Sequence, residues 1–234
     1  IYLISKGVDS ALSFTIMESV RKGKGVKEEW KEAMVAAGVP DWYIWSCKKI
    51  KYMFPKAHAA AYVMMAWRIA YCKVYYPLAY YTAFFSIRAT AFSYELMCQG
   101  KEYLESKIAE YRKNPMLSNK EQDQLRDMRI VQEMYARGFE FMKLDIYRAH
   151  SRNFQIIDGK IMPSLNSIDG MGEKAADSTM EAAIEAAKDG GFLSKEDFRN
   201  RAKVSKTICD LMGSLGILGD LPETNQISLF DFGM

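Results

Sequence analysis

Residues 167–184 read SIDGMGEKAADSTMEAAI and contain a Gly-x-Gly turn, from Gly170 to Gly172, directly before a new helix. Glycine lets the backbone adopt tight and left-handed conformations, so the N–H groups of such a turn can approach a phosphate closely. Lys174 adds a positive charge beside them. The stretch therefore predicts the end of an apolar strand or helix, a turn that is suited to binding a phosphate group, and a new helix.

A turn of this kind is typical of the helix-hairpin-helix, which binds duplex DNA by its backbone without reading the bases. A dinucleotide-binding loop is a poor alternative, because no parallel strand precedes the turn and Lys174 and Ala175 stand where the last glycine is needed. A plain glycine turn between packed helices stays open. Residues 201–207, RAKVSKT, are either a second backbone-binding segment or a solvated helix start.

The chain on the N-terminal side of this stretch has a helical pattern. Residues 10–112 carry their glycines and prolines where helices would end, and they predict four or five helices. Residues 120–137, KEQDQLRDMRIVQEMYAR, place apolar side chains at three- and four-residue spacing, and Gly138 is a suitable stop. The fold class expected from these patterns is mainly α.

A small strand element is expected after Gly138. Residues 139–145, FEFMKLD, alternate in polarity, and two β-prone runs flank Asp158-Gly159, a pair suited to a tight hairpin turn. Three short helices should follow from Ser164 onward, each beginning near a Ser or Asp that can cap it. The second part of the chain is thus predicted to be a small mixed domain with a short β-hairpin and tandem helix-hairpin-helix elements.

Composition sets broad limits on the kind of protein. The 234 residues carry a net charge of +3, and the four cysteines are scattered without a CxxC pair, which predicts reduced core thiols and suits the cytoplasm. The most apolar run, residues 57–67, is followed by Arg68 and is too short for the roughly 20 residues of a membrane span. The chain begins without an initiator Met or a signal peptide, as a segment of a longer protein would.

Residues 50–68, IKYMFPKAHAAAYVMMAWR, are a candidate nucleotide site. A helix that begins at Pro55 places His58 and Tyr62 one turn apart, with Lys51 and Lys56 near its positive N-terminal end. Such an end attracts phosphate, and a tyrosine one turn along can stack on a base or sugar. The alternative is a core helix with solvated lysines and with its Tyr and His at the rim.

The last 14 residues, LPETNQISLFDFGM, place large apolar side chains after a run of turn-forming residues. QISLF at 226–230 can anchor its Gln by hydrogen bonds and insert Leu and Phe into a pocket of another protein. The alternative is a tail that folds back on its own domain.

No group of residues suggests bond chemistry. His58 and His150 are the only histidines, and neither has a nearby Ser or Cys in a catalytic arrangement. The carboxylates are dispersed and do not form the cluster that holds two magnesium ions in a polymerase palm. We therefore expect no catalytic residue and no metal ligand in this chain.

Five segments, taken together, resemble one family: IMESVRKGKG (16–25), KYMFPKAHAAAYVMMAWRIAYCKVYYPL (51–78), QIIDGKIMPSLNSIDGMG (155–172), FLSKEDFRNRAKVSK (192–206) and LPETNQISLF (221–230). They are similar to the C-terminal part of the bacterial DNA polymerase III alpha subunits of the PolC type. The resemblance implies four regions: distal fingers of the polymerase (1–115), a connecting helix (116–139), a duplex-binding domain (140–221) and a tail that binds the sliding clamp (222–234).

The resemblance also implies roles for individual residues. The nucleotide-binding candidates are Arg21, Lys51, Lys56, His58 and Tyr62; the DNA-binding candidates are Gly170, Gly172, Lys174, Lys203 and Lys206; the clamp-binding candidates are Gln226, Ile227, Leu229 and Phe230. The expected partners are primer-template duplex DNA, an incoming dNTP, the sliding clamp and the rest of the polymerase chain, with no membrane.

The resemblance has limits. The palm with its magnesium-binding aspartates lies outside this chain, so polymerase activity and the expected Mg²⁺ cofactor belong to the longer parent protein. Ile227 stands where the clamp peptide often has Leu, and the DFGM extension after Phe230 is unusual. A stand-alone, non-catalytic DNA-binding or scaffold protein with a clamp-binding tail is the alternative hypothesis.

Overall fold

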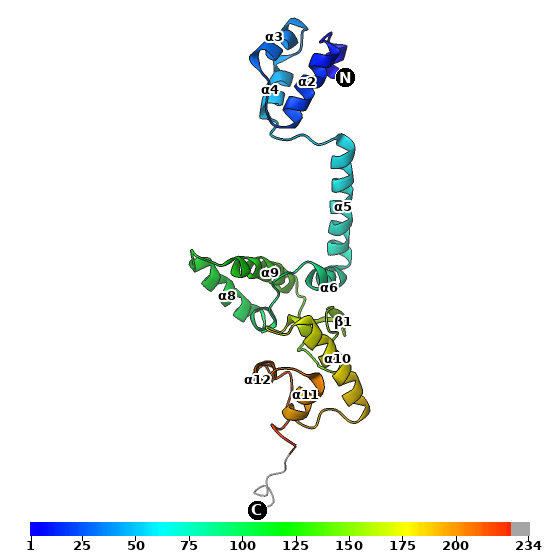
Figure 1. The fold of residues 1–234 in the computed structure, drawn as a ribbon, viewed down its shortest axis with the longest axis vertical. Helices are drawn as coiled ribbons and strands as arrows, with labels where there is room; N and C mark the ends of the chain where they lie inside the picture. Colours follow the sequence, from blue (N-terminus) through cyan, green and yellow to red (C-terminus); the bar gives the residue numbers. More distant parts are fainter. Residues whose placement is uncertain (226–234) are drawn as a thin grey trace, which may run out of the picture. The chain divides into compact units, whose positions relative to one another are not determined.

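The computed structural model describes residues 1–225, which fall into two compact units (Figure 1). One unit is Ile1–Arg68, and the other begins at Ile69. Helices dominate both units, and the only sheet in the described residues has two strands, so the predicted mainly α class is confirmed.

The first unit is a small helical cluster. Its helices are α1 (Tyr2–Ser5), α2 (Ser10–Arg21), α3 (Glu28–Ala36), α4 (Asp41–Lys49) and the first part of α5 (Lys56–Tyr75). The Asp9 side chain caps α2 by accepting from the Leu12 amide at 2.8 Å. The buried apolar side chains that hold the unit together are Leu3, Val8, Ile16, Val20, Met34, Val39, Ile44 and Cys47. No residue of α5 is buried.

The second unit begins with the rest of α5 and continues into α6 (Pro77–Ile87), α7 (Tyr94–Met97), α8 (Lys101–Lys113) and α9 (Asn119–Ala136). Helices α8 and α9 lie side by side (Figure 1). Helix α9 matches the predicted one: Ser118 and Glu121 form a capping box at its start, and Gly138 follows its end with φ +81°. Its buried residues Met128, Val131 and Met134 pack with side chains of α6 and α8.

The predicted β-hairpin is confirmed. Strands β1 (Gln155–Ile157) and β2 (Lys160–Met162) pair antiparallel with Ile156 opposite Ile161. Asp158 and Gly159 both have positive φ, at 51° and 74°, as a type I′ turn requires. The alternating residues 139–145 form only an isolated bridge from Phe141 to Ile161, so a strand there was wrongly expected.

The remaining elements are η1 (Leu165–Ser167), α10 (Glu173–Lys188), α11 (Lys195–Ala202) and α12 (Lys206–Ser214). They share a core in which Phe198, Met212 and four alanines of α10 are buried: Ala176, Ala182, Ala183 and Ala186. The small alanine side chains let neighbouring elements approach α10 closely. Figure 1 shows α11 and α12 next to each other, and α10 also contacts α11.

Two expectations need correction. Residues 10–112 hold more than four or five helices, because Pro55 and Pro77 separate α4, α5 and α6, and the single turn α7 is capped by Ser93. Cys47 and Cys209 are buried thiols, but Cys72 is exposed because it lies on α5. In residues 1–225, no helix combines the length and apolar character needed to cross a bilayer.

Candidate nucleic-acid interface

The predicted Gly-x-Gly turn connects η1 to α10 in the second unit. Gly170 has φ +82°, a left-handed conformation that glycine adopts without strain. Met171 follows with only 5% of its surface exposed, which anchors the turn in the core. Gly172 is extended, with φ −71° and ψ 161°, and stands at the N-cap of α10. Its lack of a side chain leaves the first N–H groups of α10 without a side-chain cap.

The turn Gly170–Gly172 is the first of two hairpins between helices. The second, Lys203–Ser205, has the same backbone pattern and connects α11 to α12. Lys203 takes the left-handed conformation, with φ +55° and ψ 37°, in the place of Gly170. Val204 is buried like Met171, and Ser205 is the extended N-cap of α12 in the place of Gly172. The chain thus contains tandem hairpins, although only the first has glycines at these positions.

The two hairpins differ in what they can offer an anion. The Ser205 hydroxyl accepts from the Ile208 amide at 3.3 Å, so one N–H donor at the start of α12 is already satisfied. The expectation that a Ser or Asp caps every helix in this region was wrong for α10, whose N-cap residue is Gly172. The first hairpin keeps its backbone donors for a ligand, whereas the second presents mainly lysine side chains.

The predicted DNA-binding lysines, Lys174, Lys203 and Lys206, are all exposed. Within residues 1–225, none of them forms an ion pair. The acidic residue at the start of α10, Glu173, is paired with Arg152 at 3.0 Å, which offsets its charge beside the first hairpin. The three lysines are therefore available to phosphate groups.

A cleft of about 360 Å³ lies beside the first hairpin. Gly170, Met171 and Gly172 form one side of it, and Lys120 and Gln124 of α9 also line it. Asp169 lines the cleft too, and its carboxylate accepts a hydrogen bond from the Ser93 hydroxyl, which fastens the hairpin to the start of α7. The hairpin is thus tied to a helix that comes earlier in the chain.

The first unit carries a series of exposed aromatic rings. The Tyr52 and Phe54 centroids are 4.7 Å apart, Phe54 stacks on His58 at 4.9 Å, and His58 meets Tyr62 edge-on at 4.6 Å. His58 and Tyr62 were predicted to lie together, and they do. Tyr52 and Phe54 were missed, because they lie in the irregular segment before α5, where no helical spacing marks them.

Cationic residues stand next to this aromatic series in the sequence. Lys51 and Lys56 are exposed and have no ion-pair partner among the described residues. Arg21 is already committed, because its guanidinium donates twice to Glu18, at 2.9 and 3.1 Å. The hydrogen bonds from Arg21 and Lys22 lower the pKa of Glu18 to about 2, and Glu18 in turn raises the pKa of Arg21. Among the predicted set, the two lysines are the free charges.

The clamp-binding candidates Gln226, Ile227, Leu229 and Phe230 lie outside the described residues. The chain just before them is held in place. The Lys195 amide donates to the Pro222 carbonyl at 2.8 Å, and the Glu196 amide donates to the Glu223 carbonyl at 3.1 Å. These bonds satisfy two N–H groups in the first turn of α11, so the chain up to Glu223 belongs to the second unit.

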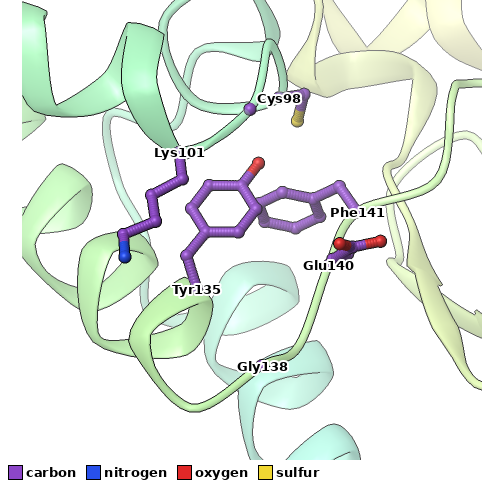
Figure 2. Close-up of a pocket in the computed structure, with 7 residues that line it drawn as sticks. Cys98, Lys101, Tyr135, Gly138, Glu140 and Phe141 are labelled. Carbon is purple, nitrogen blue, oxygen red and sulfur yellow. The ribbon is translucent and has the colours of Figure 1, made fainter.

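A pocket of about 340 Å³ elsewhere in the second unit contains a thiol and a phenol (Figure 2). Burial raises the pKa of Cys98 well above its usual value and also raises the pKa of Tyr135, whose hydroxyl donates to the Met97 carbonyl at 3.0 Å. Both groups are neutral near pH 7, and no predicted site residue lies there. The part of the chain that the structure describes brings no three Asp, Glu, His or Cys side chains together as metal ligands.

Comparison with known proteins agrees with the tandem hairpins. Residues 138–227 match a family model described as a helix-hairpin-helix motif. The match begins after α9 and includes both turns. The helix-hairpin-helix prediction is therefore confirmed in place of the alternative, a plain glycine turn between packed helices.

Relatives match almost the whole chain. PolC-type DNA polymerase III from Bacillus cereus is 52% identical over 232 residues, and that from Caldanaerobacter subterraneus is 50% identical over 231 residues. The protein of the same description from Clostridium perfringens is 48% identical over 231 residues. Each match includes 98% of this chain but only 16% of the relative's length. The resemblance to the PolC type is confirmed.

Proposed function

The chain is a segment of the PolC-type DNA polymerase III family, and we propose that it supports a DNA-directed DNA polymerase in three ways. The second unit binds duplex DNA by its backbone. The first unit contributes to positioning the incoming nucleotide and the template. The tail attaches the polymerase to a sliding clamp. Such a protein acts in the cytoplasm with the rest of the polymerase chain as its partner.

The observation that carries the proposal is the pair of hairpins inside the region that matches the helix-hairpin-helix model. Free N–H groups at the start of α10 and the positive end of its helix dipole suit one phosphate. Lys174, Lys203 and Lys206 supply charge for neighbouring phosphates. None of these groups distinguishes one base from another, so binding is independent of sequence.

Salt titration of DNA binding tests this part of the proposal. Each phosphate contact by a lysine releases counterions, so the logarithm of the binding constant falls with the logarithm of the salt concentration by about 0.9 per contact. We expect the triple variant Lys174→Ala, Lys203→Ala, Lys206→Ala to bind a short duplex more weakly and to reduce the slope by roughly 2.7.

A control with the same change in net charge makes the test specific. Lys101, Arg112 and Lys113 are exposed residues of α8 that belong to neither hairpin, and replacing all three by Ala should leave the slope unchanged. Equal losses in the two triple variants would show that net charge, and not the hairpins, governs binding. Absence of duplex binding by the unaltered chain at low salt would remove the duplex-binding role altogether.

The nucleotide-positioning role is supported by the aromatic series of Tyr52, Phe54, His58 and Tyr62 and by the free charges of Lys51 and Lys56. Exposed rings can stack on a base, and the lysines can neutralise a triphosphate. In an assembled polymerase of this family, Lys56→Ala or Tyr62→Ala should raise the KM for the incoming nucleotide or lower the rate. If neither variant changes either quantity, the first unit does not meet the nucleotide.

The clamp-binding role is supported by the QISLF peptide at 226–230. Calorimetric titration of the chain into a purified bacterial sliding clamp should give binding that is lost in the Leu229→Ala, Phe230→Ala double variant. Phe232→Ala removes an aromatic residue just outside the peptide and should bind like the unaltered chain. Binding that is absent, or equal in all three proteins, would contradict the role.

We place nucleotide transfer itself elsewhere in the longer protein. The chain spans 16% of the relatives' length, and the described residues do not gather the side chains that would hold Mg²⁺. The residues that the structure describes do not fit a magnesium site. The chain alone is expected to bind DNA without extending a primer.

A further inference from the structure

Gly23 lies in a close contact between the two parts of the candidate nucleotide site. It has φ +71°, and a Cβ built on its backbone would lie 1.9 Å from the Lys51 carbonyl oxygen. Carbon and oxygen atoms that are not bonded to each other do not approach to that distance. The contacting atom belongs to the backbone, so no change of rotamer can relieve the clash.

The contact joins the loop after α2 to the segment before α5. Two residues away in each segment, the Met53 amide donates to the Arg21 carbonyl at 3.1 Å. This bond and the Gly23 contact together fix residues 51–53 against the end of α2. Tyr52, the first ring of the aromatic series, and Lys51, one of its free cations, both lie in the fixed segment.

We propose that Gly23 is a positioning residue for the nucleotide site of the first unit. Because Gly23 has no side chain, the loop after α2 can contact the segment before α5. This contact positions Tyr52 and Phe54 relative to His58 and Tyr62 on α5. The inference rests on the proposed nucleotide-binding role. Gly23 itself touches no ligand, and any side chain there displaces residues 51–54 and disturbs the stacked series.

Gly25 provides a matched control two residues away. It also has a left-handed backbone, with φ +74°, but a Cβ there would meet nothing within 4 Å. Its carbonyl accepts from the Ser19 hydroxyl at 2.9 Å, and an alanine would keep that bond. Gly23→Ala and Gly25→Ala therefore carry the same backbone strain, and only the first also carries the clash.

Hydrogen exchange on the full chain tests the positioning directly. In Gly23→Ala we expect the Met53 amide to exchange at least tenfold faster, with the amides of α2 unchanged, because the bond to Arg21 is broken. In Gly25→Ala the Met53 amide should exchange within twofold of the unaltered chain. Equal exchange at Met53 in the two variants would overturn the proposal.

Global unfolding of the Gly23→Ala variant would hide a local effect, so a second pair of variants is needed. Asn tolerates the left-handed backbone better than Ala does, yet it brings the same Cβ. In Gly23→Asn the α2 amides should therefore stay protected from exchange, while the Met53 amide exchanges faster. In Gly25→Asn the α2 amides and the Met53 amide should all stay protected. Protection of Met53 in a folded Gly23→Asn protein would also overturn the proposal.

Titration with a fluorescent dATP analogue separates this inference from the role on which it rests. We expect Gly23→Ala to weaken binding about tenfold and Gly25→Ala to change it less than twofold. Faster exchange at Met53 with unchanged nucleotide affinity would show that the contact does not serve the site. If the unaltered chain does not bind the analogue, the nucleotide-binding role itself fails. Faster exchange at Met53 would then show only that Gly23 is needed for local packing.

Discussion

Lys203 is a residue whose backbone conformation favours glycine and whose side chain is nevertheless a lysine. Holding a non-glycine residue in the left-handed region costs about 1 kcal/mol. The equivalent position in the first hairpin, Gly170, avoids this cost. A lysine at this position is best explained by what its charge contributes, because the residue is exposed.

We therefore predict opposite effects of Lys203→Gly on stability and on DNA binding. The variant should unfold at a higher temperature, with a gain of roughly 1 kcal/mol, and its salt slope for duplex binding should fall by about 0.9. Thermal denaturation and salt titration measure the two effects. Lys206→Gly is the contrast: it should lose the same slope but destabilise the start of α12. A Lys203→Gly protein that binds DNA as the unaltered chain does would contradict the role of this lysine.

The lowered pKa of Glu18 predicts how the stability of the first unit depends on pH. Hydrogen bonds from Arg21 and Lys22 lower its folded-state pKa from 4.5 to about 2. The folded state thus favours the charged carboxylate, so this contribution to stability is complete above pH 4.5 and is lost as the pH falls towards 2. The melting temperature of the unaltered chain should exceed that of Glu18→Gln near pH 6, and the difference should shrink below pH 4.5. Glu29→Gln, whose carboxylate lies 3.7 Å from Lys27, is the control. A constant difference between pH 2 and pH 6 would contradict the prediction.

At the scale of elements, the start of α10 combines weak capping with open backbone donors. Gly172 has an ordinary φ of −71°, and a Cβ there would meet nothing within 4 Å, so a serine fits without strain. Gly172→Ser would give the first hairpin the cap that Ser205 gives the second. We expect the helix to gain a few tenths of a kcal/mol and duplex binding to weaken severalfold, because the new hydroxyl occupies an N–H that a phosphate would use.

A matched change in the second hairpin completes this experiment. Ser205→Gly should destabilise α12 slightly and leave duplex binding equal or stronger. Thermal denaturation and duplex titration of both variants are the measurements. Unchanged duplex affinity in Gly172→Ser would mean that the backbone donors of α10 are not used.

Elements whose signals are local could be predicted from the sequence. Helix α9 has a capping box, an apolar face and a following glycine, and the β-hairpin has Asp158-Gly159 at its turn, so each was found close to its observed bounds. The strand expected at residues 139–145 depended on a long-range partner and was reduced to a single bridge. The one-turn helix α7 is stabilised by burial of Tyr94 and Met97. This burial cannot be predicted from a sequence pattern of four residues.

The candidate sites divide in the same way. The His58 and Tyr62 pair follows from helical spacing, and the sequence predicted it. The place of Tyr52 and Phe54 depends on contacts with the loop after α2, which are long-range in sequence. The equivalence of the two hairpins was hidden as well, because Lys203 and Ser205 reproduce with other side chains the backbone conformations of Gly170 and Gly172. The predicted functional boundaries near residues 115, 139 and 221 stay predictions.

At the scale of the whole molecule, charge is distributed unevenly between the units. Residues 1–68 contain 11 Lys and Arg against 6 Asp and Glu, whereas residues 69–234 contain 21 against 23. The unit with the DNA-binding hairpins is thus slightly acidic overall. The proposed attraction for DNA must therefore come from the local lysines at the hairpins, because charges in solution are screened beyond about one Debye length, near 10 Å at 0.1 M salt. This is why the charge-matched α8 variant is an informative control.

The two units also have separate cores, which predicts two unfolding transitions. The core of the first unit is drawn from residues 3–47, and the buried clusters of the second from residues 81–218. Met34 and Met212 are both fully buried, one in each unit. Replacing either by Ala should cost about 2 to 5 kcal/mol in its own unit.

Differential scanning calorimetry of the full chain measures this independence. Met34→Ala should lower only one transition temperature and Met212→Ala only the other, and the double variant should show both shifts unchanged in size, because distant and independent sites add. Helix α5 contains the boundary between the two units, so unfolding could pass through it from one unit to the other. A single transition that both substitutions lower would mean that α5 transmits unfolding from one core to the other and that the chain is one cooperative unit.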